Sequence, residues 1–313
     1  MTDDTKNDST RSSASLSDTG KAVPSVPAGR RRKFRFPKNS SIALCVIAIA
    51  FYTVLAIFGE VEYRVAKAKD VVPVYNVVNE DHRYEPPSIR SGHILGTDNL
   101  GRDVLRRLVQ GTRIAYHVGI MTSLIALPLG VLLGCLGGYF GKGIDAAVVW
   151  LCATVSSVPS LLLILAVSMV VGKGLAGIYW GIGLTTWVGV CRNIRAEVIK
   201  HRDRPYVQAA RVLGYSDARI LFRHILPNVM HIVLISFSIR FPAAVGTEVF
   251  VSFLGIGVQG EPSWGVMLNN ARLRLWQGIW WEMTFVTVAI FGLVLAFNVL
   301  ADRLRDKFDP TVR

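Results

Sequence analysis

Charged residues are scarce in this chain. Of its 313 residues, 18% are Asp, Glu, Lys or Arg and 51% are apolar, whereas soluble domains carry about 25% charged residues. The apolar residues also gather in separated runs near membrane-spanning length, where a soluble protein of this size would place a charge every few positions. The sequence therefore predicts an all-α integral membrane protein.

Catalytic and metal-binding motifs are also lacking. The four cysteines form no C-x-x-C pair, and the six histidines show no spacing that would place two imidazoles on one metal. No G-x-x-x-x-G-K-[ST], G-x-S-x-G or H-E-x-x-H occurs, which excludes P-loop hydrolysis of ATP by this chain and argues against a hydrolase. Gly172, Gly174 and Gly177 spell G-x-G-x-x-G, but no strand precedes them, as a nucleotide fold requires. We predict no enzymatic activity, no metal and no cofactor in this chain.

Six apolar runs predict six membrane-spanning helices, at residues 42–58, 114–137, 146–171, 178–191, 229–251 and 284–301. The run at 178–191 is shorter than the roughly 20 residues of a typical span and in isolation could be a re-entrant segment. Residues 1–41 are polar and basic and predict a disordered tail. Residues 59–113 form a long loop, 114–303 the transmembrane core, and 304–313 a short tail.

The distribution of charge predicts the orientation in the membrane. Residues 1–41 hold nine Lys/Arg against four Asp/Glu, and residues 192–228 hold eight against three. Basic loops stay on the cytoplasmic side, so both segments are predicted to be cytoplasmic, with four spans between them. Both termini are then cytoplasmic, and loops 59–113 and 252–283 are external. Because most of the net charge of +13 lies in the two basic segments, it predicts no nucleic-acid partner.

Both external loops contain residues suited to the membrane surface. Within residues 96–111, four apolar residues at helical spacing predict a short amphipathic helix: Leu100, Val104, Leu105 and Leu108. In the second loop, four tryptophans predict anchors at the headgroup level: Trp264, Trp276, Trp280 and Trp281.

The basic loop 192–228 is the most informative segment. Between Arg204 and Asn228 it predicts two short helices. Pro205 suits a first helical turn, and Gly214 suits the left-handed position just past a helix end. Ser216 is expected to cap a second helix, which Pro227 terminates.

The first of these helices is predicted to carry a narrow apolar stripe. Its members fall at helical spacing: Tyr206, Ala209, Ala210 and Leu213. Two interpretations are open, namely that the stripe fits the groove of a partner protein or that it packs on the cytoplasmic surface of its own chain.

The same loop resembles that of the inner-membrane permease subunits of bacterial ABC importers, in particular the second permease of the dipeptide/oligopeptide group. The family pattern is Glu-Ala-Ala, three residues, Gly, nine residues, Ile, one residue, Leu-Pro. The matching positions here are Ala209, Ala210, Gly214, Leu226 and Pro227. Gln208 stands where Glu is usual and His224 where Ile is usual. Four further stretches resemble the peptide-type branch, beginning at Gly96, Val158, Phe250 and Ala296.

The resemblance implies a type I ABC importer permease fold with six transmembrane helices and a cytoplasmic coupling helix. It implies an inner-membrane location, a paralogous second permease, two ATPase subunits that bind ATP and Mg²⁺, and an external substrate-binding protein. The coupling residues would be Tyr206, Gln208, Ala209, Ala210, Leu213, Gly214, Leu226 and Pro227. The implied substrates are di- or oligopeptides, and permeases that import nickel chelates, opines or oligosaccharides are similar enough to remain alternatives.

Three residues inside the predicted spans are candidates for the translocation pathway. Arg240 lies near the middle of its span, where an arginine costs roughly 2.5–3.5 kcal/mol, so we expect it to face a wet cavity or a partner carboxylate. Glu248 lies eight residues further on, about 12 Å along the helix axis, too far for a direct ion pair. Pro159 predicts a kink more than a ligand site.

Two other classes of protein fit the sequence less well. A stand-alone ion-driven carrier would be expected to show inverted repeats and paired intramembrane carboxylates, and of these the sequence offers Glu248 alone. A membrane enzyme would need a catalytic constellation. The importer subunit is the interpretation that the sequence favours.

Overall fold

In the computed structural model, the described residues are 38–172, 174–258 and 260–308, and they are almost entirely helical. Their elements run in the order α1 (Lys38–Ala68), η1 (Val74–Asn76), η2 (Glu80–His82), α2 (Val104–Phe140), α3 (Lys142–Ser157), α4 (Ser160–Val171), α5 (Leu175–Arg202), α6 (Pro205–Val212), α7 (Asp217–Arg219), the π-helical η3 (Ile220–Ile225), α8 (Leu226–Phe253), α9 (Trp264–Arg272), η4 (Leu275–Gln277) and α10 (Trp281–Phe308). Within this part of the chain there is no strand beyond two isolated bridges, which confirms the all-α prediction. Of the predicted tails at 1–41 and 304–313, residues 1–37 and 309–313 lie outside the described residues, and the rest belongs to the ends of α1 and α10.

Among the described residues, four helical segments are long and apolar enough to cross a membrane: Ile42–Ala68, Val104–Phe140, Asp217–Phe253 and Trp281–Asp306. A fifth crossing is made if α3 and α4, which meet at a 90° bend, count as one broken span. The predicted span at 178–191 lies within α5, whose last eleven residues include Arg192, Arg195, Lys200 and Arg202 and so reduce its apolar character. The six-span count is consistent with these helices and stays a prediction.

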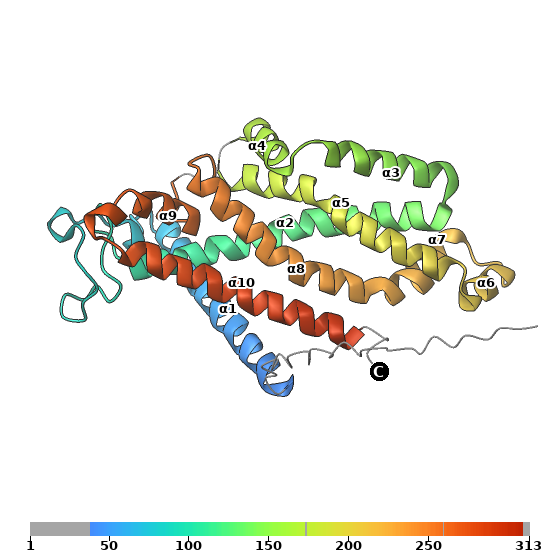
Figure 1. The fold of residues 1–313 in the computed structure, drawn as a ribbon, viewed down its shortest axis with the longest axis horizontal. Coiled ribbons are helices and arrows are strands. Elements are labelled where there is room, and N and C mark those ends of the chain that lie inside the picture. The colour runs from blue at the N-terminus through green and yellow to red at the C-terminus, as the bar shows by residue number, and fades with distance from the viewer. Residues whose placement is uncertain (1–37, 173, 259, 309–313) are drawn as a thin grey trace, which may run out of the picture. The chain divides into compact units, whose positions relative to one another are not determined.

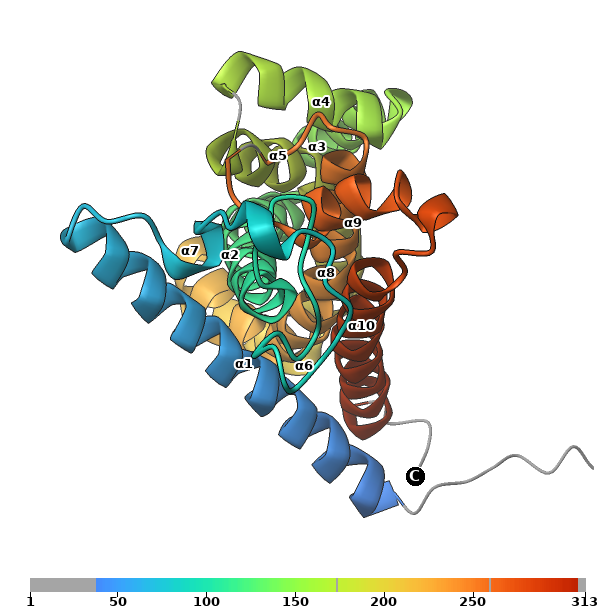
Figure 2. The ribbon, with the colours of Figure 1, turned by 90° about the vertical axis from the view of Figure 1, so that its left-hand side faces the viewer.

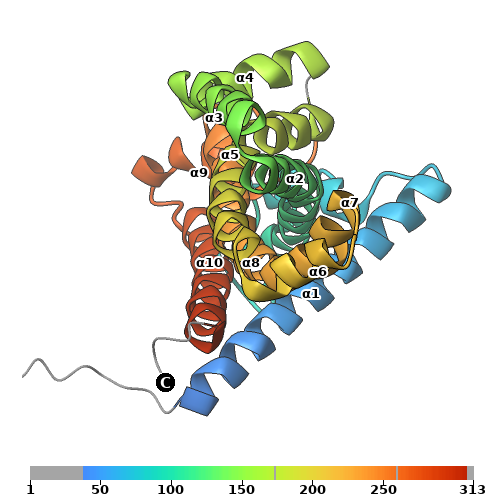
Figure 3. The ribbon, with the colours of Figure 1, turned by 90° about the vertical axis from the view of Figure 1, so that its right-hand side faces the viewer.

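The long helices lie side by side, with α6 at one end and α9 at the other (Figure 1). The turn between α2 and α3 and the segment α6–α7 lie at the same end, next to the ends of α5 and α8 (Figure 3). At the opposite end, the loop between α1 and α2 lies beside α9 (Figure 2). Loop 192–228 and the loops 59–113 and 252–283 therefore occupy opposite ends of the helices, as the predicted topology requires.

Three glycines let α2 and α5 approach closely. Gly130, Gly134 and Gly138 recur every four residues along one face of α2. A Cβ atom at Gly134 would lie 2.7 Å from the carbonyl oxygen of Cys191, and one at Gly138 would lie 2.8 Å from that of Arg195. Small residues at such spacing favour close helix contact in membranes, so this stripe holds α5, and the loop that follows it, against α2.

The break predicted at Pro159 is larger than a kink. Helix α3 ends at Ser157, Pro159 is the N-cap of α4, and the two helices are bent by 90°. Val158 and Pro159 have extended backbone, because a proline disfavours helical geometry in the residue before it and lacks an N–H group.

Loop 59–113 differs from the prediction at its end. Residues 104–111 are the first turns of α2 and not a separate surface helix. The helix begins after Asp103, whose carboxylate accepts a hydrogen bond from the backbone N–H of Arg106 at 3.0 Å. The N-cap therefore starts one long helix that continues without interruption through the predicted span.

Two of the four predicted tryptophan anchors are core residues instead. Trp264 and Trp281 are buried, and their indole N–H groups donate to the carbonyl oxygens of Leu108 (3.2 Å) and Thr97 (3.0 Å). Trp276 and Trp280 are exposed, as interface anchors would be. The prediction failed for the first two because a buried indole can also satisfy its N–H group with a backbone acceptor.

Candidate functional site

Helix α6 is a short, well-terminated helix. Pro205 occupies its first turn, and Leu213 is its C-cap. Gly214 has φ of +76°, its N–H bonds to the carbonyl of Arg211 at 2.9 Å, and the N–H of Tyr215 bonds to that of Ala210 at 3.1 Å. These two bonds form a Schellman motif, so the predicted glycine turn is present and the direction of the chain leaving α6 is set.

One face of α6 packs against its own protein. Val207 and Ala210 are buried and belong to a hydrophobic cluster with residues of α2, α5, η3 and α8, among them Tyr139, Val198, Ile220 and Ile225. Ala210, which the sequence analysis placed on the same stripe as Tyr206, Ala209 and Leu213, therefore faces inward. Its small side chain lets α6 lie close to the helix ends beneath it.

The opposite face of α6 is open and apolar. Ala209 is exposed, Val212 is 88% exposed and Leu213 is 70% exposed. Sequence analysis missed Val212, although its position three residues after Ala209 and next to Leu213 was a signal for the same face. We call Ala209, Val212 and Leu213 the open face of α6.

Polar contacts connect α6 to the end of α5. The Tyr206 hydroxyl is hydrogen-bonded to Nδ1 of His201 at 2.8 Å, and the side-chain amide of Gln208 donates to the carbonyl of Asp203 at 3.2 Å. Burial lowers the pKa of His201 below its usual value, which favours the neutral ring. Gln208, in the position where the resemblance led us to expect Glu, is exposed and contacts the backbone of its own loop.

The connection from α6 to α8 is a continuous helical path. Ser216 accepts from the N–H of Arg219 at 3.4 Å and caps α7, as predicted. The prediction that Pro227 ends this second helix is wrong. The chain continues through the π-helical η3 into α8, and Pro227 lies in the first turn of α8, where a missing N–H is tolerated because the preceding turn is widened.

Leu226 and Pro227 thus belong to the membrane helix that follows. Leu226 packs on the same cluster as Val207, and Pro227 is exposed. Two further contacts hold the surroundings of α6 in place: the Tyr139 hydroxyl donates to Asp217 at 2.6 Å, and Arg195 pairs with Asp145, one N–O distance being 2.6 Å. Helix α6 therefore shares one packed cluster with residues of α2, α5 and α8.

Arg240 lines a cavity between α5 and α8. The cavity measures about 70 Å³ and is formed by Ile182, Thr186, Arg240, Ala243, Ala244 and Thr247. The Nε atom of Arg240 is buried without a hydrogen-bond partner, and no carboxylate in the described part of the chain forms an ion pair with its guanidinium. A cavity of this volume accommodates several water molecules.

The other two pathway candidates lie elsewhere. Glu248 is 1% exposed, and it accepts a hydrogen bond of 2.7 Å from Ser252, whose hydroxyl in turn accepts from the N–H of Val258. It therefore holds the loop after α8 in place and does not line the cavity. Pro159 is exposed at the break between α3 and α4 and is also not among the cavity residues.

Comparison with known proteins identifies the family. Residues 126–313 match the model of the family described as "Binding-protein-dependent transport system inner membrane component". The chain is 34% identical to the dipeptide transport system permease protein DppC of Bacillus subtilis, over 89% of this chain and 84% of that protein. It is 33% identical to the oligopeptide transport system permease protein OppC of the same organism, over 89% and 88%. The glutathione transport system permease protein GsiD of Pectobacterium atrosepticum is 36% identical, over 76% and 78%.

These matches confirm the resemblance stated from the sequence. They cover the loop with α6, the cavity at Arg240 and both ends of the helices. The chain therefore belongs to the family of inner membrane components of binding-protein-dependent transport systems.

Proposed function

We propose that this chain is the permease subunit of an ATP-driven importer of short peptides and that α6 couples it to the motor. The observation that carries the proposal is the open face of α6, which exposes Val212 and Leu213 to 88% and 70% while the other face of the same helix is anchored. Exposed apolar side chains on a rigid helix suit insertion into the groove of a partner protein. The relatives named for dipeptide, oligopeptide and glutathione transport favour peptides of two or a few residues as substrates. Nickel chelates, opines and oligosaccharides remain alternatives for the same architecture.

The expected partners follow from membership of the family, and the lack of a P-loop in this chain supports a separate ATPase. ATP and Mg²⁺ would be bound by two separate ATPase subunits, a paralogous permease would form the other half of the pathway, and an external binding protein would deliver the substrate. The permease itself needs no cofactor for this role. Both termini and α6 would face the cytoplasm, according to the positive-inside rule.

The mechanism has one mechanical step in this chain. Closure of the ATPase pair would displace α6, and the displacement would pass to the membrane helices through the Schellman turn at Gly214 and the shared cluster around Val207. Because a packed core is bistable and does not deform continuously, α5 and α8 would tilt together. The pathway that these helices would form with the paralogous permease would then open alternately to the two sides.

Arg240 is proposed to face the substrate pathway. Its guanidinium lies in the cavity between α5 and α8 without a carboxylate partner in the described chain. An arginine within a membrane span needs water or an anion, and the carboxylate of a peptide or of the partner permease provides one. Glu248 is not retained as a pathway residue, because its carboxylate is hydrogen-bonded to Ser252.

Site-directed crosslinking tests the proposal. With Ala209→Cys in the full-length chain, a short bifunctional reagent in intact membranes is expected to join α6 to a nucleotide-hydrolysing subunit. Gly143→Cys, in the first turn of α3, where an added Cβ would meet no atom within 4 Å, serves as a control position near the same end of the helices. A crosslink from Ala209→Cys to the binding protein, or labelling of that cysteine from the outer side only, would refute both the topology and the coupling role.

A further inference from the structure

The external loop gathers three side chains that the sequence spacing did not relate. His82 and Glu85 lie in and just after η2, and His93 lies beyond a turn in the chain. One ligand atom from each of the three lies within 4.8 Å of the other two. Sequence analysis assigned no metal because these residues follow no helical ligand spacing. The turn at 88–93, closed by an antiparallel bridge between Ser88 and His93, brings them together.

Hydrogen bonds to the buried Thr97 fix the backbone at His82 and Glu85. The hydroxyl of Thr97 donates to the carbonyl of His82 at 2.5 Å and accepts from the N–H of Glu85 at 2.8 Å. Thr97 itself is fully buried, and its own N–H bonds to the carbonyl of Glu85 at 3.1 Å. The positions of His82 and Glu85 therefore do not depend on their own side-chain contact.

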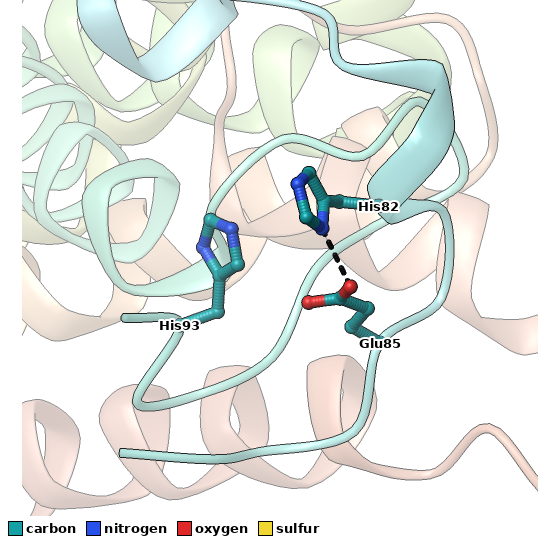
Figure 4. Close-up of side chains that lie close together, drawn as sticks. All are labelled: His82, Glu85 and His93. Atoms are coloured by element: carbon teal, nitrogen blue, oxygen red, sulfur yellow. Dashed lines mark hydrogen bonds and ion pairs between the residues drawn. The ribbon is translucent and has the colours of Figure 1, made fainter. Parts of the chain in front are cut away.

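The polar atoms of the three side chains converge. Nδ1 of His82 is 2.5 Å from Oε1 of Glu85, and the second oxygen, Oε2, is buried with no hydrogen-bond partner among the described residues. Figure 4 shows this second oxygen on the side of Glu85 that faces His93, and one ring nitrogen of His93 turned toward His82.

A fourth residue orients His93. Its Nδ1 is 2.9 Å from Oδ2 of Asp103, which leaves Nε2 as the nitrogen available to a ligand. A carboxylate on the far nitrogen of an imidazole is the usual second-shell arrangement of zinc-bound histidine, since it sets the tautomer and the ring plane. Asp103 also caps α2 through its other oxygen, so a metal at this point would link the external loop to the start of a membrane helix.

From these contacts we propose that His82, Glu85 and His93 bind a divalent transition-metal ion of the zinc class. Two imidazoles and one carboxylate with an open fourth position are a zinc ligand set, whereas Ca²⁺ and Mg²⁺ prefer oxygen ligands alone. With bonds of about 2.1 Å, two ligand atoms on tetrahedral zinc lie about 3.4 Å apart. The longest ligand separation would have to shorten by at most about 1.4 Å, which side-chain rotation supplies. The ion would replace the direct contact between His82 and Glu85. It would also give Oε2 of Glu85 the partner that this oxygen lacks.

The test measures Zn²⁺ binding to the full-length chain, purified with whatever subunits accompany it and stripped of metal with a chelator. Titration against a chromophoric zinc indicator is expected to show one equivalent per chain that Glu85→Gln and His93→Ala each remove. His224→Ala, a histidine in η3, serves as the control and should keep it. Mg²⁺ and Ca²⁺ should not compete. Co²⁺ in place of Zn²⁺ should give the visible absorption of a four-coordinate site, which His93→Ala abolishes.

The variant Asp103→Asn distinguishes an ordered zinc site from nonspecific binding of zinc by histidines. The asparagine retains an oxygen that can cap α2 but loses the charge behind His93, so the affinity for Zn²⁺ should fall about 10- to 100-fold with the stoichiometry unchanged. Glu85→Gln is close in size to the native residue, so its elution from size exclusion should match that of the native chain. Equal zinc stoichiometry in the native chain, Glu85→Gln and His93→Ala would overturn the proposal, as would an affinity unaffected by Asp103→Asn. None of these readouts depends on transport.

Discussion

Replacement of Leu213 by serine tests how much the open face of α6 contributes to docking of the ATPase. Full burial of a leucine side chain is worth about 1.5–3 kcal/mol, and Leu213 is 70% exposed in the isolated chain. A partner groove that covers the exposed part would therefore gain about 1–2 kcal/mol from this side chain. Since about 1.4 kcal/mol corresponds to a factor of ten, we expect Leu213→Ser to weaken binding of the ATPase subunits about 5- to 30-fold.

The chain offers a matched control for this substitution. Leu273, the C-cap of α9 at the opposite end of the helices, is 65% exposed. Leu273→Ser removes a similar exposed area and should leave ATPase binding unchanged. The assay is the apparent affinity of the purified ATPase for permease in nanodiscs, with substrate-stimulated ATP hydrolysis as a second readout. If Leu213→Ser and Leu273→Ser behave alike in both assays, the open face of α6 is not a docking surface.

Three further predictions concern the turn after α6, the cavity and the packing of α2 on α5. Gly214→Val should uncouple ATP hydrolysis from uptake, because a β-branched residue at φ of +76° is strained although no atom lies within 4 Å of its Cβ. Gly214→Asn should have a milder effect. Normal uptake per ATP in the valine variant would contradict the coupling role. Arg240→Ala should lower peptide uptake with assembly intact, and Arg240→Lys should retain more; uptake unchanged for every substrate tried would show the arginine to be incidental. Gly134→Ala should destabilise the chain by about 1–3 kcal/mol through overpacking, since its Cβ would lie 2.7 Å from a backbone oxygen of α5. Thermal unfolding in detergent would measure this loss of stability. The control is Gly246→Ala, whose Cβ would meet no atom within 4 Å.

Several features of the site could be predicted because they depend on neighbouring residues alone. Pro205 starts α6, Gly214 takes a left-handed conformation after it, and Ser216 caps the next helix. Each of these is decided by the backbone chemistry of one residue and its hydrogen bonds within a few positions. The error at Pro227 came from applying a helix-termination rule where a π-helical turn absorbs the missing N–H.

The burial of individual residues could not be predicted in the same way. Ala209 and Ala210 are adjacent and similar in type, yet one is exposed and the other is buried against η3 and α8. Trp276 and Trp281 illustrate the same point in loop 252–283. Helical spacing shows which residues share a face, but it does not show which face another element covers.

By itself, the sequence determined that this protein is a helical membrane protein, that its basic loop is residues 192–228, and how α6 begins and ends. Hydropathy, charge and capping decide these features because they act over short stretches of chain. Tertiary structure alone decided which side of α6 is open, that Arg240 lines a cavity with no carboxylate partner among the described residues, and that His82, Glu85 and His93 meet. These properties depend on contacts between segments far apart in the chain or across irregular turns, whose geometry no local pattern of residues specifies.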